Sequence, residues 1–71
     1  MITIKLPGSK ILKCQSTGKR KKIKLLKSGD LFLFQDSIYE KQTVGSCNIS
    51  DLEDIIEPDE NEYVEVYEEV K

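Results

Sequence analysis

With 71 residues, the chain has room for a single domain around one small hydrophobic core. It has no histidine and two cysteines, so there is no Ser-His or Cys-His pair for nucleophilic catalysis, and we do not expect an enzyme. The net charge is only −2, but the charge is divided along the chain. Every lysine and arginine except Lys41 and Lys71 lies in residues 1–29, and every acidic residue lies from Asp30 onward.

This division of charge has two interpretations. Segregated charge is typical of a protein with an electrostatic partner or with a head-to-tail contact between subunits, so we expect a homo-oligomer. Alternatively, the two halves pair within one fold, because neighbouring strands of opposite charge stabilise each other weakly. Both interpretations remain open at this point.

The first third of the chain predicts short strands and turns. Apolar and polar residues alternate at 2–6, which indicates a half-buried strand that ends in a Pro7-Gly8 turn. A second strand is expected at 10–16 and a turn at Thr17-Gly18, followed by a third short strand at 23–25. The four consecutive cations between that turn and the third strand would then form the tip of a basic hairpin.

The longest apolar run, Leu31–Phe34, carries both phenylalanines and lies between turn-forming residues. This pattern is typical of a strand covered on both faces, and we expect the rest of the chain to pack around it. A three-residue hairpin loop at 35–37 should lead to a returning strand at 38–44. The returning strand is poorly amphipathic, which indicates an exposed or edge position.

Residues 50–57 are ambiguous between helix and strand. A capping box at 50–53 and apolar residues at helical spacing indicate a helix, but only about two turns fit before Pro58. We expect a strand at 47–50 and then one short helical turn. A turn at 58–61 and a closing strand at 63–70 complete the chain.

Together these elements predict an all-β fold, or β with one short helix, as one domain over residues 1–71. The expected architecture is a small antiparallel β-barrel of about five strands. A twisted open sheet carrying one short helix is the alternative; the barrel is favoured because closure removes unprotected edges. Cys14 and Cys47 are expected to be buried thiols, and a single disulfide between them is the alternative.

Segments 26–34, 38–40 and 56–66 carry a resemblance. They contain a Leu-x-x-Gly-Asp-Leu-Phe strand, a Tyr-Glu hairpin return and a Pro-Asp turn before a Val-Glu-Val end. This pattern resembles small uncharacterised proteins of phages and mobile elements that have a barrel of the Src-homology-3 type. The resemblance implies a small barrel and a viral or plasmid source, and it indicates fold rather than function.

The first functional hypothesis is a non-enzymatic binding module, encoded by a phage or mobile element, that sequesters an anionic ligand. That ligand would be a nucleotide signal of a host defence system, or nucleic acid. Cations at a hairpin tip attract phosphates, and a free tyrosine ring can stack on a base. The candidate ligand-binding residues are Lys19, Arg20, Lys21, Lys22, Lys24 and Tyr39.

The alternative hypothesis is a protein-binding inhibitor of a host protein, of the anti-defence or anti-CRISPR kind. Carboxylates along the last strand would imitate a phosphate backbone, and the candidates are Glu62, Glu65 and Glu69. A solvated strand face that discourages edge pairing is the simpler explanation of these acids.

Neither a metal site nor a membrane segment is indicated. The acidic residues lack the spacing of the calcium-binding loop, and no cofactor motif is present. No apolar run is long enough for a signal peptide or a membrane span, so we expect a soluble protein of the host cytoplasm without a membrane partner.

Overall fold

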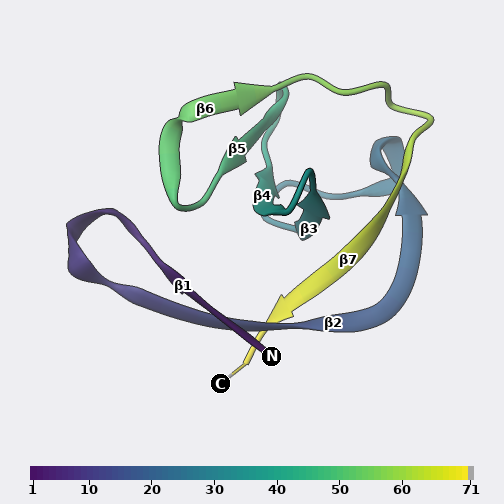
Figure 1. Cartoon of the computed structure of the whole chain (residues 1–71). Coiled ribbons are helices and arrows are strands. Elements are labelled where there is room, and N and C mark those ends of the chain that lie inside the picture. Colours follow the sequence, from purple (N-terminus) through teal and green to yellow (C-terminus); the bar gives the residue numbers. More distant parts are fainter. Residues whose placement is uncertain (71) are drawn as a thin grey trace.

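A computed structural model describes residues 1–70 and contains one seven-stranded antiparallel sheet, in the order β1-β2-β7-β3-β4-β5-β6. The strands are β1 (Ile2–Lys5), β2 (Ile11–Lys22), β3 (Leu31–Phe34), β4 (Ser37–Lys41), β5 (Ser46–Asn48), β6 (Asp51–Ile56) and β7 (Tyr63–Glu69). Two 3-10 turns, η1 (Pro7–Ser9) and η2 (Ile23–Leu25), are the only helical elements in this part of the chain. The sheet curls into a half-barrel (Figure 1). The all-β prediction is confirmed, with more strands than the expected five.

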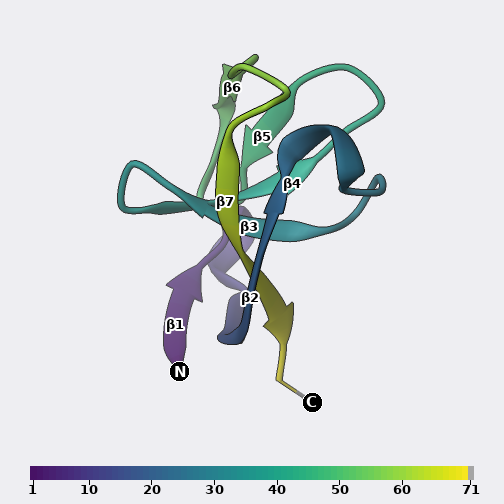
Figure 2. The ribbon, with the colours of Figure 1, turned by 90° about the vertical axis from the view of Figure 1, so that its right-hand side faces the viewer.

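The long strand β2 corrects the prediction of a basic hairpin. It runs through Thr17-Gly18 without turning and sweeps around one side of the molecule (Figures 1 and 2). Its register with β7 shifts between Ser16 and Arg20, and Gly18 has a φ of 77°. The expected turn is therefore wrong: its glycine takes the left-handed conformation inside a β-bulge. Residues 23–25 are likewise η2 rather than a strand.

Pairing of β2 with β7 brings the basic and acidic parts of the chain together. Arg20 lies opposite Glu65 in the register, and Gln15 Nε2 donates a 3.3 Å hydrogen bond to Glu68 Oε1. Between β2 and β7, the basic and acidic parts of the chain therefore pair within one fold, as the second interpretation of the charge division states.

The hydrophobic core lies on one face of the β3–β4 hairpin, whereas the apolar run predicted a strand covered on both faces; in β3 only Phe32 is buried. Phe32 is 0% exposed, and its ring stacks on that of Tyr39 at 6.1 Å between centroids. Residues of η2, the segment after it and β7 cover this pair: Ile23, Leu26 and Val64. The core therefore includes one side chain, Ile23, from a 3-10 turn outside the sheet.

Two predictions about β4 are wrong. The loop before it has two residues, Gln35 and Asp36, with φ of 49° and 65°, the positive values that a tight hairpin turn requires. The strand itself is interior, because β3 and β5 pair with its two edges, and Ile38 and Tyr39 are buried. Poor amphipathicity here reflects a strand that buries residues on both faces.

The ambiguous residues 50–57 form β6 and no helical turn. Cys47 of β5 lies opposite Ile55, so the sheet supplies the backbone partners that a two-turn helix would lack. Asp51 Oδ1 accepts a 3.1 Å hydrogen bond from the Glu53 amide, the kind of local bond that also serves turns. Both cysteines are free thiols, with Cys14 buried and Cys47 half-buried. No helix within residues 1–70 is long and apolar enough to cross a membrane.

Candidate binding groove

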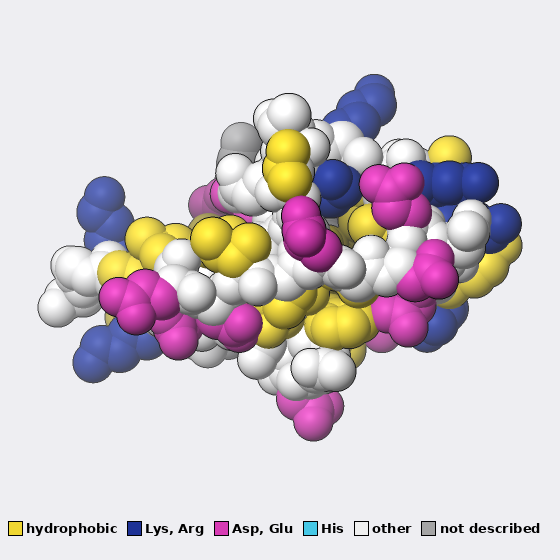
Figure 3. All heavy atoms as spheres, turned by 90° about the horizontal axis from the view of Figure 1, so that it is seen from above, with side chains coloured by type: hydrophobic (Ala, Val, Ile, Leu, Met, Phe, Trp, Pro, Cys, Tyr) yellow, Lys and Arg dark blue, Asp and Glu magenta, His cyan; other side chains and the backbone are white. Residues whose placement is uncertain are grey.

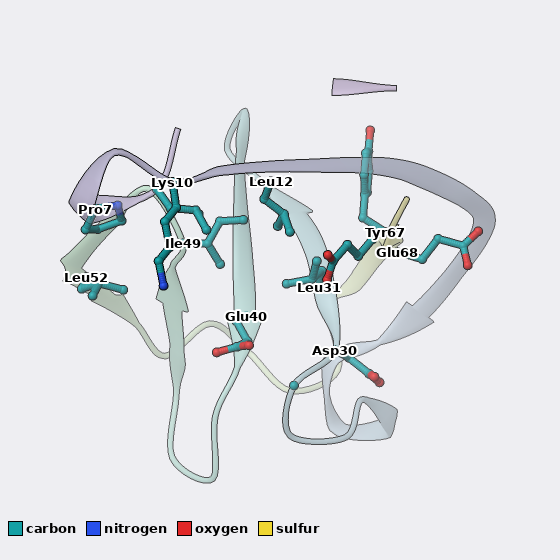
Figure 4. A pocket seen from close by; sticks show the side chains of 13 residues that line it. Pro7, Lys10, Leu12, Asp30, Leu31, Glu40, Ile49, Leu52, Tyr67 and Glu68 are labelled. Carbon is teal, nitrogen blue, oxygen red and sulfur yellow. The ribbon is translucent and has the colours of Figure 1, made fainter. Parts of the chain in front are cut away.

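A groove of about 590 Å³ opens on the side of the β3–β4 hairpin that faces away from the core. One wall is the hairpin of β1 and β2, with Leu6, Pro7 and Leu12. Ile49 of the β5–β6 turn and Leu52 of β6 also line the groove, and Leu52 lies near Pro7 at one end (Figure 4). The volume lies within the usual range for pockets that hold ligands.

Local hydrogen bonds fix the walls of the groove. The Leu6 amide donates to the Lys10 carbonyl at 2.8 Å, which closes the turn around η1. At the floor, the Gly29 amide donates to the Lys41 carbonyl and the Lys41 amide donates to the Asp30 carbonyl, both at 2.8 Å. These bonds extend the β3–β4 ladder by one step and hold Asp30 beside Leu31. Both walls of the groove are therefore built on paired backbone.

Carboxylates outnumber cations around the groove. Its charged lining residues are Lys10, Asp30, Glu40, Glu68 and Glu69. Glu40 Oε1 accepts a 2.7 Å hydrogen bond from Gln42 Nε2, and Asp30 Oδ2 accepts one of 2.9 Å from the Lys27 amide. These donors are neutral, so they orient the carboxylates without cancelling their charge. The groove therefore combines apolar walls with a negative rim.

The groove carries no nucleophile–base pair. Its lining contains no serine, threonine, cysteine or histidine. Burial, followed by the charge of Glu65, raises the pKa of Tyr67, so this phenol stays protonated at neutral pH. Burial also raises the pKa of the Cys14 thiol nearby in β2, which disfavours the reactive thiolate. The arrangement is suited to binding.

The six residues proposed as an anion site do not come together as expected. Lys19, Arg20 and Lys21 are exposed along the second half of β2, and Lys24 is exposed on η2. Lys22 is half-buried, with its ammonium 5.7 Å from the centre of the Tyr63 ring. The five cations thus follow a strand and the turn after it, and none of them lines the groove.

Tyr39, the sixth residue, was wrongly expected to have a free ring. It is 4% exposed, and its hydroxyl donates a 2.6 Å hydrogen bond to Asp54 Oδ2. Asn48 Nδ2 donates to the same carboxylate oxygen at 3.1 Å. The hydrogen bond between Tyr39 and Asp54, with burial, raises the pKa of Tyr39. The bonds from Tyr39 and Asn48 both lower the pKa of Asp54. Tyr39 is a structural link between β4 and β6.

The three carboxylates of the acidic-strand hypothesis lie in two places. Glu69 lines the groove, whereas Glu62 and Glu65 line a separate hollow beside Arg20 and Tyr63. They do not form one continuous acidic face. The groove residues that the sequence did not reveal come from the β1–β2 connection, β2, β3 and the loop before it, β4, the β5–β6 turn, β6 and β7, and no local pattern links these segments.

Comparisons with protein-family models, with curated proteins and with solved structures gave no match.

Proposed function

We propose that this chain is a non-enzymatic binding module that holds a short segment of a partner protein in the groove beside the β3–β4 hairpin. The segment would carry apolar and basic side chains. One observation supports this proposal above the others: the groove has apolar walls, and its rim carries four carboxylates and a single lysine.

The apolar walls would supply affinity, and the acidic rim would select basic segments over acidic ones. Leu12, Leu31 and Ile49 would lose contact with water when an apolar side chain lies against them, which favours association in proportion to the area buried. The carboxylates would attract basic side chains and disfavour acidic ones. In Figure 4 the space lies between two hairpins, with Pro7 and Leu52 at one end and Tyr67 and Glu68 at the other. Such an elongated space suits an extended segment.

Like the acidic-strand hypothesis, this proposal describes a protein-binding module that uses carboxylates. It places the binding site in the groove instead of along the last strand. An inhibitor that occupies a basic surface of a host protein needs carboxylates near an apolar anchor, and here Glu68 and Glu69 of β7 supply the carboxylates. In this proposal one end of β7, together with the other segments that line the groove, takes the place of the phosphate-mimicking strand.

The test is a titration of the isotope-labelled protein with two short synthetic peptides, one alternating leucine and lysine and the other alternating leucine and glutamate. The lysine peptide should shift the amide signals of Leu12, Leu31 and Ile49. Glu69→Gln should weaken its binding about two- to fivefold, the range of one exposed ion pair.

Glu62→Gln is the matched control, because it removes the same charge from the residue just before the same strand, outside the groove. It should bind as the wild type does. Equal binding of both peptides, or signal shifts that avoid the groove, would contradict the proposal.

Anion binding by the second half of β2 is the second candidate function. Lys19, Arg20, Lys21 and Lys24 are all exposed within six positions, although the strand beside them carries acids. A nucleotide signal or nucleic acid would be held mainly by charge, because Tyr39 is buried and not available for stacking. Sequestration of a defence signal would then depend on low ionic strength more than on shape.

A further inference from the structure

The sheet has two free edges, and both are strands of ordinary length. β1 pairs only with β2, and β6 pairs only with β5, among the pairings of residues 1–70. An unpaired strand edge is a template for another strand, and proteins usually protect it or use it. The half-barrel leaves both edges open, whereas a closed barrel would have paired them.

Exposed apolar side chains gather at these two edges. Leu52 and Ile55 of β6 are 60% and 64% exposed. Ile2 of β1 is 39% exposed, and Ile11 at the start of β2 is 65% exposed. Viewed from the side of β6, hydrophobic side chains lie at the surface between acidic ones (Figure 3). Isolated exposed apolar residues need no explanation, but their concentration at unpaired edges indicates contact surfaces.

The two edges carry opposite charge. Lys5, Lys10 and Lys13 belong to the hairpin of β1 and β2, which has no acidic residue. Asp51, Glu53 and Glu57 lie on or just after β6, which has no basic residue. Two β6 edges would repel each other, and so would two β1 edges. A β1 edge and a β6 edge attract.

We infer that β1 of one copy adds to β6 of a second copy, so that the sheet continues from chain to chain. The occupant of each edge is another copy of this chain because the complementary strand is present in the chain itself. This pairing joins unlike surfaces, so it gives a closed ring or a reciprocal dimer when the rotation closes, and a filament when it does not.

The inference is independent of the proposed function. Leu52 of β6 and part of the β1–β2 hairpin also line the groove, but the assembly contact uses the outer backbone edges of β1 and β6 and charged residues outside the groove. Variants can therefore separate the two. Glu53 and Lys5 are exposed, lie on the edge strands and do not line the groove.

The experiment measures association by sedimentation velocity over a range of protein concentrations at low salt. The wild type should form a species larger than a monomer. Lys5→Glu and Glu53→Lys should each weaken association roughly tenfold or more, because each places like charges across the contact. The double variant Lys5→Glu with Glu53→Lys should recover association, since the two charges have exchanged places.

The matched controls are Lys27→Glu and Glu60→Lys, which reverse exposed charges away from both edges. They should associate as the wild type does, and circular dichroism should show that every variant keeps the fold. A wild type that remains monomeric would overturn the inference and leave the edges to other chains. Single edge variants that behave like the controls, or a double variant without recovery, would also overturn it.

Discussion

The two faces of the β3–β4 hairpin use alternate residues of the same strands, yet one face is sealed and the other is half open. Phe32 and Tyr39 point into a core that η2 covers, whereas Leu31 and Glu40 lie in a groove that the hairpin of β1 and β2 only borders. The difference arises from what covers each face, since both contain apolar residues. It teaches that stability and binding can be assigned to opposite sides of one strand pair.

The largest expected effect tests the sealed face. Phe32→Ala should cost about 3–5 kcal/mol, the usual range for a fully buried phenylalanine. A domain of this size has roughly that much stability in total, so the variant should be largely unfolded at room temperature. Leu31→Ala, one position away on the open face, should cost only about 1 kcal/mol, because its side chain is half-buried. Urea denaturation followed by circular dichroism measures both, and similar losses would break the comparison between faces.

The next effect concerns the basic half of β2, which belongs to neither face. The triple variant Lys19→Glu, Lys21→Glu, Lys24→Glu should abolish binding to a single-stranded oligonucleotide at low salt. Each phosphate contact adds about −0.7 to the slope of log affinity against log salt concentration, so the wild type should show a slope of about −2 or steeper if these three lysines act together. Binding of the lysine peptide in the groove should be unchanged. A triple variant that binds the oligonucleotide normally would remove the second candidate function.

The smallest expected effect is a pH dependence of the unfolding free energy, which arises from Asp54 at the polar rim of the sealed face. Hydrogen bonds from Tyr39 and Asn48 lower the pKa of Asp54 in the folded protein. The unfolded state therefore binds the proton more tightly, so this contribution to stability is fully present above the ordinary carboxyl pKa of about 4. It is lost as pH falls through the lower folded pKa.

Asp54→Asn is the control, because the amide oxygen can still accept from the Tyr39 hydroxyl but does not titrate. The difference in unfolding free energy between wild type and variant should shrink as the pH falls from 5 to about 2. A constant difference over this range would show that Asp54 is not held in its charged form by these partners.

Elements with a strong local pattern could be predicted from the sequence. β3 occupies the predicted residues, and β7 ends one residue before the expected position. Both have an apolar pattern that no other local preference opposes. The thiol state of Cys14 and Cys47 was also predictable, because free cysteines usually pack as small apolar side chains.

Elements decided by distant partners could not be predicted. Thr17-Gly18 has the chemistry of a turn, but the Thr17 hydroxyl donates to the Val66 carbonyl at 2.9 Å across the sheet, and a bulge results. The capping pattern at 50–53 gives way to pairing with β5 for the same reason. The groove is even harder to predict from the sequence, because it forms only when five or more separate segments meet around it.

The position of β7 also determines how the sheet can form while the chain is being made. In the hairpin of β1 and β2 and in the meander from β3 to β6, strands that follow each other in the sequence are also neighbours in the sheet. β7 is different, because it lies between β2 and β3. The strands β2 and β3 therefore cannot be joined into one sheet until residues 63–69 have left the ribosome. A strand of seven residues therefore completes both halves at once, and a chain cut before it would have two incomplete sheets.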